Sequence, residues 1–244
     1  MFAARREIGS CGAASAAART CKLLNDRAFL AMIDKTNDRA KSVRMSKGEQ
    51  TRSAIVAQSL DLASVVGLNG LSIGALAEHT GMSKSGLFAH FGSKEALQLA
   101  VLDAAEERFV EMVVKPASKA PRGVARIREV FERGFEWERS WAGKGGCVFN
   151  ASAPEFDDQP GAVRDRLVRA QRDWRETLIR VARGAVQTGE FRPDLDCEQF
   201  AYEGKAINLG YIHSSRLMRD PKAEEHARAA FERLIRTSLA QQPH

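Results

Sequence analysis

The chain has 244 residues, of which 44% are hydrophobic and 28% charged, an ordinary composition for a globular protein. No apolar run approaches the ~20 residues that span a bilayer, so no membrane partner is expected. Only seven prolines interrupt long stretches of Ala, Leu, Arg and Glu, which favours an all-α fold.

The formal net charge of +6 suggests a nucleic-acid partner, but the charge is unevenly distributed. Residues 1–44 hold nine Lys/Arg against four Asp/Glu, whereas residues 45–97 hold four of each. Any DNA binding by residues 45–97 must therefore depend on where a few cations point rather than on bulk charge.

Residues 1–44 form an N-terminal extension rich in Ala, Ser and Arg, with weak periodicity. Three interpretations are open. The extension is a transit peptide, a basic arm that touches DNA, or the product of a mis-annotated start upstream of Met45. We expect it to be disordered or absent from the natural protein.

The first strong helical pattern covers residues 49–66, and Gly67 is expected to end it. Three short helices follow. Ser72 caps the first and Gly81 ends it, Ser83 caps a second over residues 84–91, and Ser93 caps a third.

Two helices joined by a tight glycine turn are a helix-turn-helix. The second helix opens with Ser83, Lys84, Ser85 and Gly86, so small donors and one cation stand at a helix N-terminus. Such an end suits the phosphates and base edges of a DNA major groove. The same turn also occurs as a plain packing corner, so a helical dimer that never meets DNA is an alternative.

Residues 51–97 resemble the DNA-binding domain of the TetR/AcrR family of bacterial transcriptional regulators. The resemblance is carried by three runs: Leu71-Ser72-Ile73, Gly81-Met82-Ser83, and Leu87-Phe88-Ala89-His90-Phe91-Gly92-Ser93-Lys94-Glu95-Ala96-Leu97. The commonest family form of the last run is Leu-Tyr-x-x-Phe-x-x-Lys-x-x-Leu. Phe88 replaces the tyrosine, which removes a hydroxyl that often reaches a phosphate in the family.

The resemblance implies three regions: the extension 1–44, a three-helix DNA-binding domain over residues 45–97, and a helical effector-binding and dimerisation domain over residues 98–244. Together with the capped helix ends, it implies a set of DNA-binding residues: Thr51, Arg52, Ser72, Ile73, Ser83, Lys84, Ser85, Gly86, Leu87, Phe88, His90 and Lys94.

Beyond residue 93 the apolar spacing predicts further helices. Pro116 is expected to end the first of them, and residues 115–123 to form a linker. The predicted helices cover residues 94–114, 124–141, 148–155, 163–185, 197–217 and 223–239. Small residues in the last two, such as Gly204, Ala206 and Gly210 in the first and Ala227 and Ala230 in the second, would let a partner helix approach closely, which predicts a homodimer built on a four-helix bundle.

Aromatic side chains with a few polar neighbours recur through the C-terminal helices, and such a set describes a small-molecule pocket. It equally describes a helical core with satisfied polar groups, and the pocket interpretation depends mainly on the family resemblance. The candidate ligand-binding residues are Trp137, Trp141, Phe149, Asn150, Trp174, Tyr202, Asn208 and Tyr211.

No catalytic or metal motif is present, so we expect no enzyme activity, no catalytic residue, no metal and no cofactor. The four cysteines form no Cys-x-x-Cys pair, which favours a reduced, cytoplasmic protein. The sequence thus predicts a homodimeric repressor that binds a palindromic operator and is released by a small effector. The alternatives are a redox-sensing regulator using Cys147 or Cys197, an enzyme, and a helical dimer without DNA.

Overall fold

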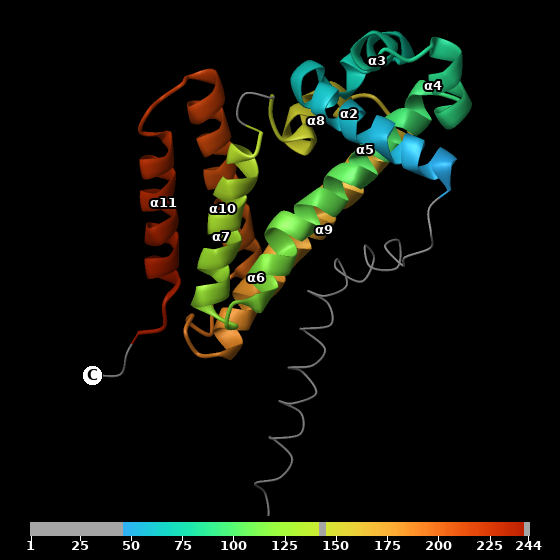
Figure 1. Ribbon diagram of the computed structural model, residues 1–244. Helices are drawn as coiled ribbons and strands as arrows, with labels where there is room; N and C mark the ends of the chain where they lie inside the picture. The colour runs from blue at the N-terminus through green and yellow to red at the C-terminus, as the bar shows by residue number, and fades with distance from the viewer. Residues whose placement is uncertain (1–45, 142–144, 242–244) are drawn as a thin grey trace, which may run out of the picture.

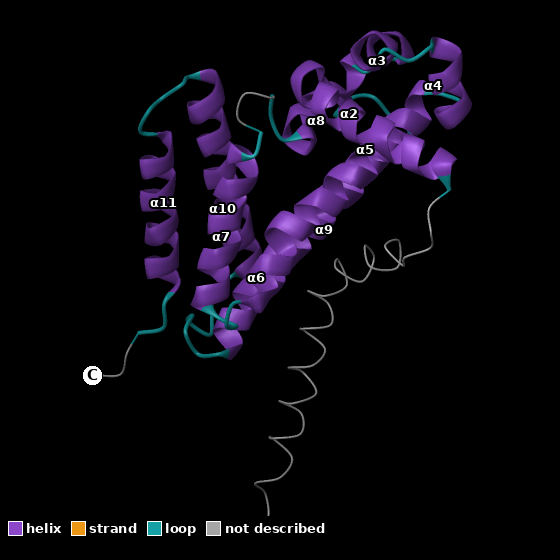
Figure 2. Cartoon of the chain, in the orientation of Figure 1, coloured by secondary structure: helices purple, strands orange, loops and turns teal. Residues whose placement is uncertain are grey.

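The computed structural model describes residues 46–141 and 145–241, and its regular elements are helices (Figures 1 and 2). In these ranges the only bridge of β type is a single antiparallel pair between Phe191 and Leu239. The predicted all-α fold is confirmed. The predictions for residues 1–44 lie outside the described residues.

The helices follow the predicted order closely. They are α2 (Lys47–Gly70), α3 (Ile73–Thr80), α4 (Lys84–Phe91), α5 (Lys94–Phe109), the π-helix η1 (Val110–Val114), α6 (Lys115–Lys119), α7 (Val124–Arg139), α8 (Val148–Phe156), α9 (Ala162–Gln187), α10 (Cys197–Ile212), the π-helix η2 (His213–Leu217) and α11 (Ala223–Ser238).

Each helix of the helix-turn-helix begins at the serine that the sequence indicates. The hydroxyl of Ser72 accepts a hydrogen bond from the backbone N–H of Ala75 at 3.1 Å, and Ser83 accepts from Gly86 at 3.1 Å. Gly81, with φ of 69°, ends α3 in the left-handed conformation. Local chemistry alone therefore fixes where α3 and α4 begin and where α3 ends.

Gly67 breaks α2 near its end, as its position in the sequence predicts. Its φ of 74° lies outside the helical region, and one further turn carries α2 to Gly70. A Cβ atom at Gly67 would also lie 1.7 Å from the Oε1 atom of Glu155, in α8. Two requirements, a left-handed backbone and a close neighbour, thus coincide at this glycine.

The prediction that Pro116 ends the fourth helix is wrong. The chain stays helical through α5, η1 and α6 and ends only at Ala120. The π-turn η1 lies directly before the proline, where the amide of Lys115 bonds to the carbonyl of Val110. A wider turn makes room for a residue that has no N–H, so the expected linker of residues 115–123 is largely helical.

The long helices α5 and α9 run beside each other across the molecule, and α7, α10 and α11 lie to one side of them, with α10 packed on both α9 and α11 (Figure 1). The α5–α9 contact contains a half-buried ion cluster: Arg166 binds Asp103 at 2.9 Å and Glu106 at 2.5 Å. Arg228 of α11 binds Glu132 of α7 and so links these two helices.

The expected domain boundary after Leu97 falls inside α5 (Lys94–Phe109). One buried core cluster contains Leu76 and Leu87 of the helix-turn-helix as well as Trp137 and Cys147 from beyond the boundary. The two predicted regions are therefore joined by a shared core as well as by a continuous helix.

Candidate functional site

The N-terminal end of α4 presents polar side chains to solvent. Ser83, Lys84 and Ser85 are exposed, and the hydroxyls of Ser83 and Ser85 lie 3.3 Å apart. Phe88 follows on the outer side of the helix with 55% of its surface exposed. This surface can offer hydroxyls, one ammonium and the first amides of a helix to an anionic partner.

Several residues of the predicted DNA-binding set are engaged inside the molecule instead. Leu87 has no exposed surface and packs in the core, so its prediction as a DNA contact is wrong. Ile73 packs against the same core. Arg52 is half-buried with its guanidinium 4.5 Å from the centre of the Phe91 ring, which joins α2 to α4.

The remaining members of the set have mixed positions. Thr51 donates its hydroxyl to the carbonyl of Lys47, and Lys94 donates to the carbonyl of Asn69 at 2.6 Å. Ser72, Gly86 and His90 are half-buried. The freely presented group is therefore smaller than predicted and centres on the exposed residues of α4.

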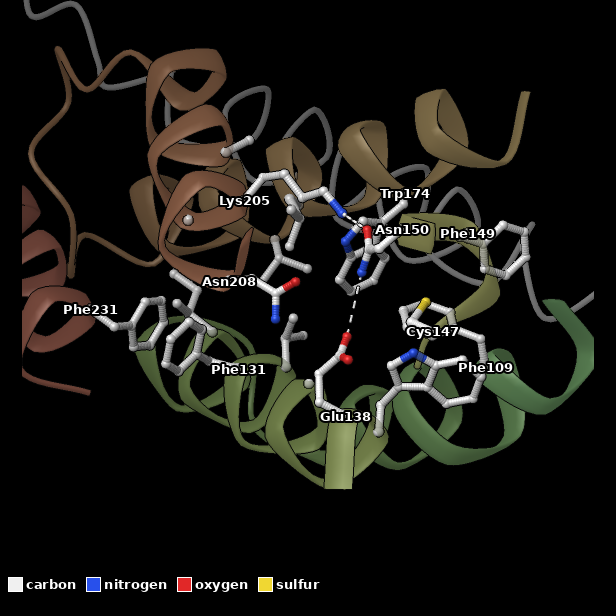
Figure 3. A pocket seen from close by; sticks show the side chains of 18 of the residues that line it. Phe109, Phe131, Glu138, Cys147, Phe149, Asn150, Trp174, Lys205, Asn208 and Phe231 are labelled. Carbon is white, nitrogen blue, oxygen red and sulfur yellow. Dashed lines mark hydrogen bonds between the residues drawn. The ribbon is translucent and has the colours of Figure 1, made fainter. Parts of the chain in front are cut away.

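A cavity of about 110 Å³ lies among α5, α7, α8, α9, α10 and α11 (Figure 3). Its wall is largely aromatic, and two ring pairs are nearly perpendicular: Phe109 with Trp174 at 4.8 Å and Phe109 with Trp137 at 5.2 Å. At another part of the wall Phe131 stacks on Phe231. The aromatic lining residues are Phe109, Phe131, Trp137, Phe149, Trp174, Phe200 and Phe231.

Five of the eight predicted ligand-binding residues line this cavity: Trp137, Phe149, Asn150, Trp174 and Asn208. The other three do not line it, and their prediction is corrected. Trp141 is buried beneath the guanidinium of Arg108, 4.4 Å from its ring centre. Tyr211 packs on Phe135, and Tyr202 is 68% exposed on the outer side of α10.

The polar groups of the cavity form a chain of hydrogen bonds. The Lys205 ammonium donates to Asn150 Oδ1 at 3.1 Å, and Asn150 Nδ2 donates to Glu138 Oε1 at 3.5 Å (Figure 3). Burial raises the pKa of the Glu138 carboxyl to about 7, and burial lowers the pKa of Lys205. The second carboxylate oxygen, Glu138 Oε2, is buried without a hydrogen-bond partner.

Among the cavity residues that the sequence interpretation missed, Glu138 and Lys205 are the two that belong to the hydrogen-bonded chain. A signal for both exists. Glu138 continues the apolar stripe of Phe131 and Phe135, and Lys205 lies one turn from Ala201 and three residues before Asn208. A charged residue at core spacing indicates either a buried ion pair or a binding site.

Neither described cysteine has the chemistry of a ready redox sensor. Burial raises the pKa of the Cys147 thiol to about 11 and also raises the pKa of Cys197. The thiolate is the reactive form, so both residues are held in their less reactive state. Cys147 instead serves as an apolar part of the cavity wall.

Helix α8 touches both the cavity and the end of α2. Asn150, in its first turn, lines the cavity, whereas Glu155, near its other end, accepts a hydrogen bond from the backbone N–H of Asn69 at 3.1 Å. Just before α8, the amide of Gly146 donates to the carbonyl of Ser64 at 2.9 Å. A nine-residue helix thus connects the cavity wall to the helix-turn-helix region.

One side of α10 carries exposed apolar and small residues at helical spacing. It continues into η2, and we call it the α10 stripe: Tyr202, Ala206, Leu209 and Gly210 of α10 and Leu217 of η2. Gly204, expected at the centre of a helix–helix contact, lines the cavity instead, and a Cβ atom there would meet nothing within 4 Å. Of the small residues singled out in this helix, Ala206 and Gly210 belong to the stripe.

In the described ranges no helix is both long enough and apolar enough to cross a membrane. The same ranges contain no cluster of three His, Cys, Asp or Glu side chains arranged to hold a metal ion.

Two parts of the chain match known protein families, one over the helix-turn-helix and one over the C-terminal helices. Residues 55–101 match "Bacterial regulatory proteins, tetR family", and residues 123–231 match "Tetracyclin repressor-like, C-terminal domain". The HTH-type transcriptional regulator SrpR of Pseudomonas putida is 22% identical over 187 residues, which cover 73% of this chain and 81% of SrpR.

Solved structures share the fold. A TetR transcriptional regulator from Chloroflexus aurantiacus superposes with a TM-score of 0.71 at 29% identity, covering 80% of this chain and all of that one. AibR, solved with isovaleryl coenzyme A and operator DNA, superposes with a TM-score of 0.59 at 22% identity, covering 75% of this chain and 97% of AibR. The capped helix-turn-helix, the helical C-terminal part and these matches lead to one conclusion: the chain belongs to the TetR family of transcriptional regulators.

Proposed function

We propose that this protein is a repressor that binds a palindromic operator as a homodimer and leaves it when a small effector enters the cavity. Residues 45–97 are proposed to bind DNA, and residues 98–244 to bind the effector and dimerise. The observation that carries the proposal is α8, which joins an aromatic cavity to the end of α2.

DNA contact is assigned to the exposed end of α4. Ser83, Lys84 and Ser85 supply hydroxyls and one cation at a helix N-terminus, and Phe88 supplies an apolar surface that suits a thymine methyl group. One helix of eight residues reads only a few base pairs. Two copies are needed to reach half-sites ~34–36 Å apart or a multiple of that distance.

The dimer is assigned to the α10 stripe. Its exposed apolar residues would be buried by the same stripe of a second copy, and Ala206 and Gly210 permit close approach of the two helices. The partly charged outer side of α11 would form the polar rim of such a four-helix interface.

Effector release is assigned to movement of α8. A molecule that displaces Asn150 or Phe149 would shift the start of this short helix, and Glu155 would carry the shift to Asn69 at the end of α2. AibR offers a relative in which a small molecule and operator DNA are bound by one protein of this fold. The proposal places the protein in the cytoplasm, where bacterial operators are.

Footprinting on DNA fragments that flank the protein's own coding region tests the proposal. We expect one protected palindrome with two half-sites, a stoichiometry of one or more dimers per site, and loss of protection when an effector is added. Uniform protection without a sharp site would contradict a sequence-specific operator. A protein that is monomeric at micromolar concentration yet binds its site tightly would contradict the dimer.

A further inference from the structure

The cavity contains one buried acceptor that the protein itself leaves unpaired. Glu138 Oε1 receives a weak hydrogen bond from Asn150, but Glu138 Oε2 is shielded from solvent and has no partner. A buried oxygen without a donor is costly, because it has lost its water and gained nothing in exchange. A bound molecule with a donor at this point would remove that cost.

Two observations decide which sign of charge that molecule carries. The buried carboxylate oxygen Glu138 Oε2 needs a donor from the ligand, although Lys205, which uses one N–H on Asn150, and the unpaired Nε1 of Trp137 can also donate into the cavity. The surrounding wall is aromatic, and the faces of aromatic rings attract cations and disfavour anions. The unpaired carboxylate oxygen and the aromatic wall together favour a positively charged head group.

The rest of the cavity sets the size and polarity of the ligand body. Its ≈110 Å³ approaches the ~150 Å³ of cavities that take up benzene, so a single ring fits with little rearrangement. Gly134 of α7 and Gly204 of α10 both border open space, since a Cβ atom at either would meet nothing within 4 Å. Because neither glycine has a side chain, the space in the cavity beside them is left open for a ligand.

We propose that the effector is a small amine with an apolar, ring-sized body, whose ammonium group binds Glu138 Oε2 while its body lies against Trp174 and Phe109. This inference rests on the proposed function, because it names the class of molecule that occupies the same cavity. Asn208, which points into the cavity near Glu138 in Figure 3, is the second polar contact available to the head group.

The titration of the site agrees with this assignment. The charged groups that act on Glu138 are Lys205 and Arg216, and burial nevertheless keeps the pKa of Glu138 at about 7. An ammonium beside the carboxylate would lower that pKa, so amine binding should release a proton near neutral pH and strengthen as the pH rises from 6 to 8.

Three matched probes test the proposal: benzylamine, benzyl alcohol and benzoate, which share a ring and differ in the head group. Binding is measured on the full chain by calorimetry and by the fluorescence of Trp137 and Trp174, which line the cavity. We expect benzylamine to bind at least 10-fold more tightly than benzyl alcohol, and benzoate more weakly than either.

Two variants and one control locate the effect. Glu138→Gln keeps the shape of the side chain and should weaken benzylamine binding 10- to 100-fold while leaving benzyl alcohol unchanged. Gly204→Leu fills the cavity and should abolish binding of all three probes. Glu136→Gln changes the same residue type on the same helix, where Glu136 pairs with Arg133 at the surface, and should leave all three affinities unchanged.

The inference is overturned if benzylamine fails to bind at millimolar concentration, if benzoate binds best, or if Glu138→Gln leaves amine binding unaltered in a folded protein. Operator binding separates this inference from the proposed function. Sharp operator binding without amine selectivity refutes only the ligand class. Amine binding that depends on Glu138, in a protein without any operator, refutes only the regulator.

Discussion

The helix-turn-helix and the cavity differ in how far along the chain their interacting residues lie. In the helix-turn-helix each capping serine bonds to an amide three residues later, as Ser72 does with Ala75. In the cavity Lys205 and Asn150, 55 residues apart, meet across two helices. The first kind of contact forms with the helix itself, whereas the second exists only after α8 and α10 have packed.

The difference shows how this protein separates recognition from response. The helix-turn-helix is a set of short, individually capped helices whose outer residues face solvent, so its surface is available to a large rigid partner. The cavity encloses charged residues whose burial is unfavourable in the free protein. A region with such uncompensated groups is the one that gains most from a ligand.

The largest effect is expected from disrupting the proposed dimer, on which both operator binding by the helix-turn-helix and its release by an effector depend. Gly210→Arg places a long cation in the middle of the α10 stripe. If the stripe is the dimer interface, the variant should be monomeric and should bind the operator ~100-fold more weakly or worse, because the two half-sites are no longer linked. Analytical ultracentrifugation and a DNA-shift assay measure the two outcomes.

Ala125→Arg is the matched control for the dimer prediction, because Ala125 is exposed on α7 outside the α10 stripe. It should remain dimeric and bind the operator normally. A Gly210→Arg protein that still dimerises would show that the dimer interface lies on a surface other than the α10 stripe.

The next effect concerns how a buried cavity residue, Glu138, changes the free energy of unfolding of the protein. The pKa of Glu138 is about 7 in the folded protein against 4.5 as the reference value, so the folded state holds an extra proton between these values. The protonated Glu138 carboxyl therefore stabilises the folded state fully below pH 4.5, and this stabilisation is lost as the pH rises through 7. Glu138→Gln should be more stable than the wild type at pH 8, by no more than about 3 kcal/mol, and the gain should shrink toward pH 5.

Urea denaturation at several pH values between 5 and 8 measures this difference. Glu136→Gln, at the surface of the same helix, should show no comparable pH dependence relative to the wild type. A constant gain for Glu138→Gln at all pH values would show that the carboxyl of Glu138 does not titrate in this range.

A smaller effect tests the connection between the two regions. Glu155→Ala removes the acceptor that holds the backbone N–H of Asn69 at the end of α2. The variant should lose about 1 kcal/mol of stability. A higher effector concentration should also be needed to release the variant from the operator, because α8 has lost this hydrogen bond to α2.

An effector titration monitored by DNA binding checks the coupling. Asp158→Ala, an exposed acid just after α8, is the control and should respond like the wild type. An unchanged response of Glu155→Ala would assign the signal to α5 alone.

The smallest effect is expected at the DNA surface. Lys84→Ala removes the only cation of the first turn of α4, so operator binding should weaken several-fold. If the contact is to phosphate, the slope of log K against log salt should fall by about one. Lys119→Ala, an exposed cation at the end of α6, is the matched control and should leave both quantities unchanged. Equal affinities for Lys84→Ala and wild type at every salt concentration would remove Lys84 from the interface.

The sequence by itself determined the helices and most of their ends. Capping serines and a left-handed glycine act within three or four residues, so their effect is present before any tertiary contact forms. The family motif in residues 87–97 is equally local. For this reason the all-α fold and the family were both predictable from the chain alone.

The site was predictable only in part, because spacing shows that a residue faces inward but not what it meets there. Trp174 and Tyr211 both lie on inward faces, yet only Trp174 borders the cavity, while Tyr211 packs on Phe135. Likewise Gly204 and Gly210 are both small residues of α10, and with α10 packed against α9 and α11, Gly204 lies in the cavity wall and Gly210 is exposed outside it.

Tertiary structure alone decided that Pro116 continues a helix, that Lys94 binds Asn69, and that Glu138 has an unpaired oxygen. Each outcome depends on a neighbour distant in the chain or on a change of helical pitch, neither of which has a local signal. Packing is set by the combined shape of all the helices, so the same side chain can be a core residue, a cavity wall or an exposed surface. The chemistry of the cavity follows from that packing and not from any single motif.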